Sequence, residues 1–94
     1  MDKRALVRVL RERFPHLPAA AIKRMTDVVF ETIADTVARD DVVEIRGFGT
    51  FFSTRMSRRL LRSPGGGMLE APSRRLPRFR ASRQLRIRVN GVRR

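Results

Sequence analysis

Arginine is the residue type best placed to do chemistry in this chain, and it is concentrated in the second half. Residues 42–94 contain 14 arginines opposed only by Glu44 and Glu70, whereas residues 1–41 contain 8 basic and 7 acidic side chains. The guanidinium group is a flat fork of donors that suits phosphate oxygens and can enter a narrow minor groove. A concentrated positive field attracts phosphates and releases their counterions, so this half is predicted to bind a polyanion.

The densest part of this charge lies between residues 55 and 80, on both sides of the turn signal Pro64-Gly65-Gly66-Gly67. Counting residues 51–64 at about 3.3 Å per residue gives a hairpin arm of roughly 40 Å. A small core cannot bury that length, and an isolated two-stranded ribbon is only marginally stable in water. We therefore interpret the segment as a projecting arm that becomes ordered on a partner. A flexible basic loop without fixed geometry is the alternative.

Catalysis and metal binding have little support in the other polar residues. The only histidine, His16, lies in a proline-rich loop, and the chain contains no cysteine, which excludes disulfides and thiolate sites. Asp27, Glu31 and Asp35 repeat every four residues, as a solvated helix face does. We predict a protein that is not an enzyme and has no cofactor or metal. No apolar run approaches the roughly 20 residues that span a bilayer, so a cytoplasmic protein is expected.

The first half must supply the scaffold, and its apolar spacing predicts two helices. Asp2 is expected to cap a helix over about residues 3–14, and Pro18 to begin a second over about residues 18–39. The second helix carries a broad apolar stripe formed by Ile22, Met25, Val29, Ile33 and Val37. A chain of 94 residues buries a thin core alone, so oligomerisation is expected to add burial.

From residue 42 the pattern changes to strands. Residues 42–46 alternate as a strand with Val43 and Ile45 on one face, and the strand resumes at residues 50–54 after Gly47-Phe48-Gly49. Residues 68–76 are predicted to return as its partner, and Ser82 to cap a short last helix.

Several of these segments together resemble the bacterial HU/integration host factor family of histone-like DNA-binding proteins. The resemblance is carried by Val43-Glu44-Ile45-Arg46-Gly47-Phe48-Gly49-Thr50-Phe51, by Arg62-Ser63-Pro64 as an arm tip, and by Pro77-Arg78-Phe79 with Ser82-Arg83-Gln84-Leu85-Arg86 as return strand and last helix. It covers nearly the whole chain, in order and spacing. Glu44-Ile45-Arg46 favours an integration host factor subunit, of the beta type. Asp40-Asp41 stands where the family usually has a glycine.

The resemblance implies an α+β fold that forms an intertwined dimer from a single domain, residues 1–94. A helical hairpin (1–41) would form the dimerisation body, followed by a three-stranded antiparallel sheet with an extended β-arm (42–81), then a C-terminal helix and tail (82–94). It also implies a nucleoid-associated protein whose arms wrap the minor groove of double-stranded DNA and bend it, with Pro64 intercalating between base pairs. The implied DNA contacts are Lys3, Arg46, Arg55, Arg58, Arg59, Arg62, Pro64, Arg74, Arg75, Arg78, Arg80, Arg83 and Arg86. The implied dimer core contains Val29, Ile33, Phe48, Phe51, Phe79 and Leu85.

Two other functions fit the charge alone. An RNA-binding or ribosome-associated protein would usually expose aromatic side chains for stacking, and this chain has no Trp or Tyr. A membrane-surface protein would need large apolar anchors on a basic helix, and residues 83–94 offer few. Homodimer and heterodimer both remain open, and the scarcity of uncharged polar side chains in the arm indicates low sequence specificity.

Overall fold

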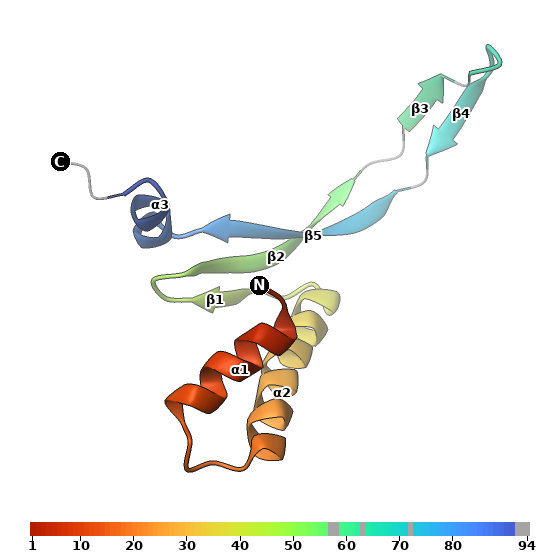
Figure 1. Ribbon diagram of the computed structural model, residues 1–94. Helices are drawn as coiled ribbons and strands as arrows, with labels where there is room; N and C mark the ends of the chain where they lie inside the picture. The colour runs from red at the N-terminus through yellow and green to blue at the C-terminus, as the bar shows by residue number, and fades with distance from the viewer. Residues whose placement is uncertain (57–58, 63, 72, 92–94) are drawn as a thin grey trace. The chain divides into compact units, whose positions relative to one another are not determined.

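A computed structural model describes residues 1–56, 59–62, 64–71 and 73–91 of the chain (Figure 1). By their contacts the residues fall into two compact units, Met1–Asp35 and Thr36–Arg94. The first unit holds helix α1 and most of helix α2. The second holds the end of α2, the strands and helix α3.

Helix α1 (Lys3–Arg13) begins at the predicted cap, where Asp2 Oδ1 accepts a hydrogen bond from the Ala5 N–H at 2.9 Å. It ends at Phe14, because Pro15 cannot continue a helix. Helix α2 (Ala19–Ala38) starts after Pro18, whose carbonyl accepts hydrogen bonds from the N–H groups of residues 21 and 22. Both helices match the predicted ranges to within a residue at each end.

The centre of the helical unit is small. Ile22 and Thr26 are 2% and 5% exposed, and Thr26 donates its hydroxyl proton to the Ile22 carbonyl at 2.8 Å, so that its polar group is satisfied. An apolar hollow of about 410 Å³ lies beside them. Its lining includes Leu6, Leu10, Phe14, Met25, Val29 and Phe30. Val29 remains 54% exposed, so one chain leaves much of its apolar stripe uncovered.

Strands β1 (Val43–Ile45), β2 (Gly49–Met56) and β5 (Arg74–Ala81) form an antiparallel sheet in the order β1-β2-β5. Gly47, with φ 81°, makes the turn between β1 and β2. Phe51 pairs with Val43 on one side and with Phe79 on the other. Gly49 is required because a Cβ there would overlap the ring of Phe79. The strand predicted from the alternation of Val43 and Ile45 is present as β1, which pairs with β2.

Strands β3 (Arg59–Arg62) and β4 (Met68–Ala71) pair as a second antiparallel ladder. The β2–β5 ladder ends at the pair Met56–Arg74, and the β3–β4 ladder begins at the pair Arg59–Ala71. Two residues separate the ladders on each side, so both keep the same register. The predicted partner strand at 68–76 is divided between β4 and the start of β5. Pro72, between the two strands, lies outside the described residues.

Pro77 lies inside β5, opposite Ser53, as the resemblance to a return strand implies. A proline is tolerated there because β5 is an edge strand of its sheet. Helix α3 (Arg83–Val89) follows, with Ser82 Oγ accepting a hydrogen bond from the Leu85 N–H at 3.0 Å. The predicted α+β fold and the cap of the last helix are confirmed. In the part of the chain that is described, none of the helices combines the length and apolar character needed to cross a membrane.

Candidate nucleic-acid interface

The pleat of β2 and β5 sorts the arginines of β5 onto two faces. Residues that pair across a ladder share a face, and successive residues alternate between faces. Arg74, Arg78 and Arg80 therefore share one face with their β2 partners Met56, Phe52 and Thr50. Arg75 lies on the other face, opposite Arg55. We call the first of these the arginine face, and its three arginines are exposed.

Two side chains of β2 support the arginine face. The guanidinium carbon of Arg80 lies 4.8 Å from the centroid of the Phe52 ring, a cation–π contact. Arg78 donates from Nε to the hydroxyl of Thr54 at 3.2 Å. These contacts hold the guanidinium groups at Cζ of Arg80 and Nε of Arg78, and both arginines remain exposed. The arrangement offers outward-facing guanidinium groups to a phosphate backbone.

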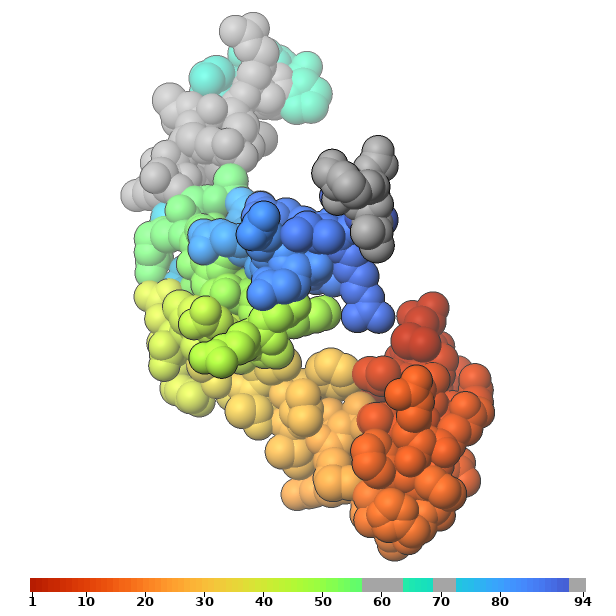
Figure 2. Space-filling model, turned by 90° about the vertical axis from the view of Figure 1, so that its left-hand side faces the viewer, coloured from red at the N-terminus to blue at the C-terminus, as the bar shows by residue number. Residues whose placement is uncertain are grey.

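Other predicted contacts lie on neighbouring elements of the same unit. Arg46 occupies the turn between β1 and β2, and Arg83 and Arg86 lie on α3; all three are exposed. The Ser82 N–H donates to the Phe48 carbonyl at 2.9 Å and so joins the start of α3 to that turn. In Figure 2 the residues of β5 and α3 (blue) form one continuous surface with those of β1 and β2 (green).

The arm contributes the remaining predicted contacts. Arg59 and Arg62 are the first and last residues of β3, paired with Ala71 and Met68. Pro64 is exposed in the turn that follows, where Gly66 has φ 98°. Arg58 lies outside the described residues. The roles of these arm residues stay predictions.

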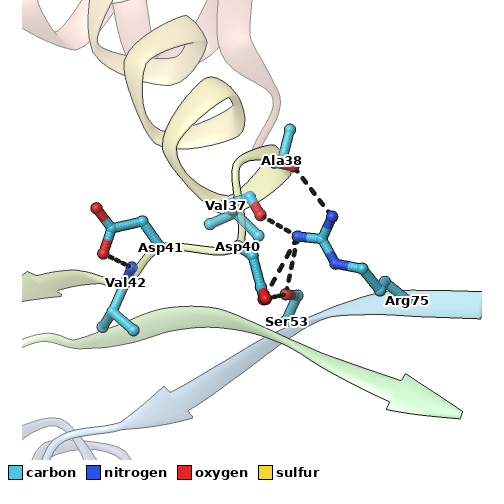
Figure 3. Close-up of polar contacts among 7 residues, drawn as sticks. All are labelled: Val37, Ala38, Asp40, Asp41, Val42, Ser53 and Arg75. Carbon is cyan, nitrogen blue, oxygen red and sulfur yellow. Dashed lines mark hydrogen bonds and ion pairs between the residues drawn. The ribbon is translucent and has the colours of Figure 1, made fainter.

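Arg75 differs from the other predicted contacts because its guanidinium faces the protein. Its Nη2 donates to the Val37 carbonyl at 2.8 Å and to Ser53 Oγ at 3.1 Å, and its Nη1 donates to the Ala38 carbonyl at 3.1 Å. Asp40 Oδ1 lies 3.5 Å from Nη2. Figure 3 shows this side chain extending from β5 past Ser53 to the end of α2. Sequence reasoning grouped Arg75 with Arg74, although strand alternation separates the two.

Lys3 also has an acidic partner. Its Nζ lies 2.8 Å from Asp27 Oδ1, and Lys23 approaches the other oxygen of that carboxylate at 3.8 Å. The hydrogen bond from Lys3 lowers the pKa of Asp27, and the same bond raises the pKa of Lys3. Lys3 remains exposed. Its predicted role at DNA is not tested by this geometry.

The three phenylalanines assigned to a dimer core form one cluster. The ring centroids of Phe51 and Phe79 lie 4.8 Å apart, and those of Phe48 and Phe79 lie 5.3 Å apart. Phe48 and Phe79 nevertheless stay 44% and 43% exposed in the single chain. Ile33 and Leu85 are half-buried. Apolar side chains that are clustered but only half covered fit a core shared with a second chain, and that assignment stays a prediction.

Sequence reasoning missed the supporting residues Phe52, Ser53 and Thr54 and the acidic partner Asp40. Phe52 and Thr54 could have been found by aligning β2 with β5 and reading every second residue. Asp40 could not, because it reaches Arg75 only when the end of α2 lies next to β5.

Comparison with known proteins gives concordant results. The model of the bacterial DNA-binding protein family matches residues 1–90. Integration host factor subunit beta of Azoarcus sp. (strain BH72) is 36% identical over 93 residues, which cover 98% of this chain and 99% of that protein. The subunit of the same name from Dechloromonas aromatica (strain RCB) is 34% identical over 91 residues, 96% of this chain and 97% of that protein.

Solved structures give the same fold. Anabaena HU, in a cocrystal with DNA, superimposes with a TM-score of 0.83 at 30% identity, covering 95% of this chain and 97% of that one. An HU variant from Thermotoga maritima superimposes with a TM-score of 0.68 at 20% identity, covering 95% and 99%.

Proposed function

We propose that this chain, which belongs to the bacterial DNA-binding protein family, is an architectural protein that binds duplex DNA through the minor groove and bends it. The family predicted from the sequence motifs is confirmed, including the preference for an integration host factor subunit of the beta type. Catalysis has no part in this function.

The arginine face is the observation that carries the proposal beyond family membership. Arg74, Arg78 and Arg80 project from one side of the sheet, and the β3–β4 ladder continues from the same end of β2 and β5. A sheet with an attached ribbon supports a duplex whose phosphates meet the arginines of the face while the ribbon follows a groove. Contacts of this kind go to the backbone, so the protein binds with low sequence specificity.

The active form is a dimer, a homodimer or a heterodimer with a related subunit, and it acts on the nucleoid in the cytoplasm. The half-covered phenylalanine cluster and the open apolar hollow support this assembly. The curated relatives are named as subunits, which agrees with it. The RNA-binding alternative is not favoured, because Phe48, Phe51 and Phe79 pack on one another instead of standing apart as stacking surfaces.

Salt-dependent binding tests the function directly. If a dimer neutralises on the order of 8 phosphates, the slope of log affinity against log salt for duplex DNA is about −7. Competition at one salt concentration between duplex DNA, single-stranded RNA and anionic vesicles separates the alternatives. A preference for RNA or vesicles, or a complex insensitive to salt, contradicts the proposal.

The arm tip has its own test. Pro64→Ala should leave the folded body intact and reduce the DNA bend, because an unstacked base step costs a few kcal/mol and would no longer be compensated by apolar packing against the proline ring. Energy transfer between the ends of a duplex of about 35 base pairs measures the bend at saturation, and Gly67→Ala in the same turn is the control. Equal bends for wild type and Pro64→Ala would mean that Pro64 only shapes the turn.

A further inference from the structure

The guanidinium group of Arg75 is bonded to acceptors of the protein, and the side chain is only partly exposed. Its side chain is 31% exposed, and its Nε is buried without a hydrogen-bond partner among the described atoms. Both terminal nitrogens point at acceptors of the protein itself (Figure 3). Arg74, the preceding residue, is exposed on the opposite face of the same strand.

Arg75 donates to two carbonyls at the C-terminal end of α2, one of which, that of Val37, also accepts a hydrogen bond from the Asp40 N–H at 2.9 Å. The last four carbonyls of a helix have no intrahelical donor, and the negative end of the helix dipole lies there. The last turn of α2 supplies no basic side chain for them. Arg75 donates to the Val37 and Ala38 carbonyls at 2.8 and 3.1 Å, so a cation 37 residues further along the chain caps the helix.

Asp40 completes the cluster from an unusual backbone position. It has φ 64°, in the left-handed region that favours glycine. Its Oδ1 accepts the proton of Ser53 Oγ at 2.9 Å and lies 3.5 Å from Arg75 Nη2. A glycine there would relieve the backbone strain but would provide no carboxylate. The aspartate that replaces the glycine usual in this family therefore has a partner that accounts for its side chain.

From these contacts we infer that Arg75 is a positioning residue. It latches the end of α2 to strands β2 and β5, next to the Met56–Arg74 pair at which the β2–β5 ladder ends. In this role it does not bind phosphate. The latch consists of Arg75, Asp40, Ser53 and the carbonyls of Val37 and Ala38. This inference rests on the proposed DNA binding, because the parts that Arg75 positions are the arginine face and the start of the arm, which are proposed to contact DNA.

The electrostatics of the latch oppose a phosphate contact. Three of the five N–H donors of Arg75 are already bonded to Val37, Ala38 and Ser53, so a phosphate that engaged both terminal nitrogens would compete with these acceptors, and it would meet the Asp40 carboxylate at close range. Arg74 presents no such obstacle. The two neighbouring arginines should therefore respond differently when each is replaced.

Arg75→Gln and Arg74→Gln form the matched pair for the test, with thermal unfolding, the salt slope and the DNA bend as measurements. Arg74→Gln should make the slope shallower by about 0.9 for each phosphate that is no longer neutralised, and leave the thermal midpoint unchanged. Arg75→Gln should lower the midpoint by about 10 °C, keep the slope, and reduce the bend at saturation. A slope that becomes as shallow in Arg75→Gln as in Arg74→Gln, with an unchanged midpoint, overturns the inference.

Two further variants keep the test decisive. Arg75→Lys should behave like Arg75→Gln, because an ammonium group cannot reach both carbonyls and Ser53 in the planar geometry of the fork; rescue by lysine would instead indicate a phosphate contact. Asp40→Asn should lower the midpoint, with an effect that is not additive with Arg75→Gln. Tighter DNA binding by Asp40→Asn at an unchanged midpoint would mean that the carboxylate merely competes with DNA. The unfolding measurements need no DNA, so they test the latch even if the proposed function fails.

Discussion

The two faces of the β2–β5 ladder use the same residue types for opposite purposes. On the arginine face, Phe52 lies under Arg80 and leaves the guanidinium accessible from outside. On the other face, Phe51 and Phe79 pack on each other, and Arg75 turns its guanidinium toward the protein. A phenylalanine thus supports a charge on one face and builds a core on the other.

Composition alone therefore cannot assign a role to an arginine. Arg74 and Arg75 are neighbours in one strand, yet one is exposed and the other is bonded to the end of α2. Strand alternation decides the face, and the acceptors within reach decide the role. The net charge of the second half therefore overstates the number of arginines that are available to a polyanion.

Gly49 leaves no room for a side chain on the face of the ladder that carries Phe51 and Phe79, which we call the packed face. In Gly49→Ala the new Cβ would overlap the Phe79 ring and would lie 2.6 Å from the carbonyl oxygen of Arg80. The backbone cannot yield without disturbing the β2–β5 ladder, so we expect a loss on the order of 3 kcal/mol or more in the free energy of unfolding. Thermal or denaturant unfolding measures it.

Gly67→Ala is the matched control for that change. A Cβ at Gly67 would meet nothing within 4 Å, and its φ is not in the left-handed range. Its unfolding free energy should stay within about 0.5 kcal/mol of wild type. If Gly49→Ala proved equally mild, the packed face would be looser than its close contacts indicate.

Much of the fold could be predicted from the sequence because local signals and burial agree there. Asp2 and Ser82 cap helices as their side chains allow, and prolines mark both ends of the loop between α1 and α2. The division of the return strand into β4 and β5 was not predicted. Pro77 is accepted in an edge strand, and the sequence does not show which strand lies at an edge.

The sequence predicted where the candidate site lies, but it did not predict the contacts that support the arginines. Charge segregation located the basic half, and the motifs located the turns and the arm. The latch depends on a contact between residues 37–40 and residue 75, which no spacing rule links. Asp40 looked like a departure from the family pattern, and only its contact with Arg75 gives that departure a physical reason.

Phe52 on the arginine face and Phe51 on the packed face should respond differently to the same substitution. Phe52→Leu keeps apolar bulk under Arg80 but removes the ring, a contact worth about 0.5–1 kcal/mol at an exposed site. We expect DNA affinity to fall by about two- to five-fold, with little change in the thermal midpoint. Phe51→Leu, on the packed face, should lower the midpoint instead. Identical responses from the two variants would contradict the separation of the faces.

In the helical unit, Lys3 has an acidic partner as Arg75 has, and this pair should contribute less to stability. The hydrogen bond from Lys3 lowers the pKa of Asp27 in the folded chain, so the unfolded chain binds the proton more readily. The stability contributed by the pair is therefore present above the ordinary Asp pKa of about 3.9 and is lost as pH falls through the lower folded value. Because Lys3 is exposed and Asp27 is only half-buried, the contribution is small and is screened by salt.

Asp27→Asn tests this contribution through the thermal midpoint as a function of pH, with Asp35→Asn on the same helix as the control. Asp27→Asn should be less stable than wild type at pH 7 in low salt, and the difference should shrink with added salt and disappear in strong acid. The raised pKa of Lys3 gives the opposite sign at the alkaline end, where the contribution is lost as pH rises through the folded value. A difference that stayed constant across this range would mean that Asp27 stabilises the helices by packing, and that Lys3, unlike Arg75, is not held by its charge partner.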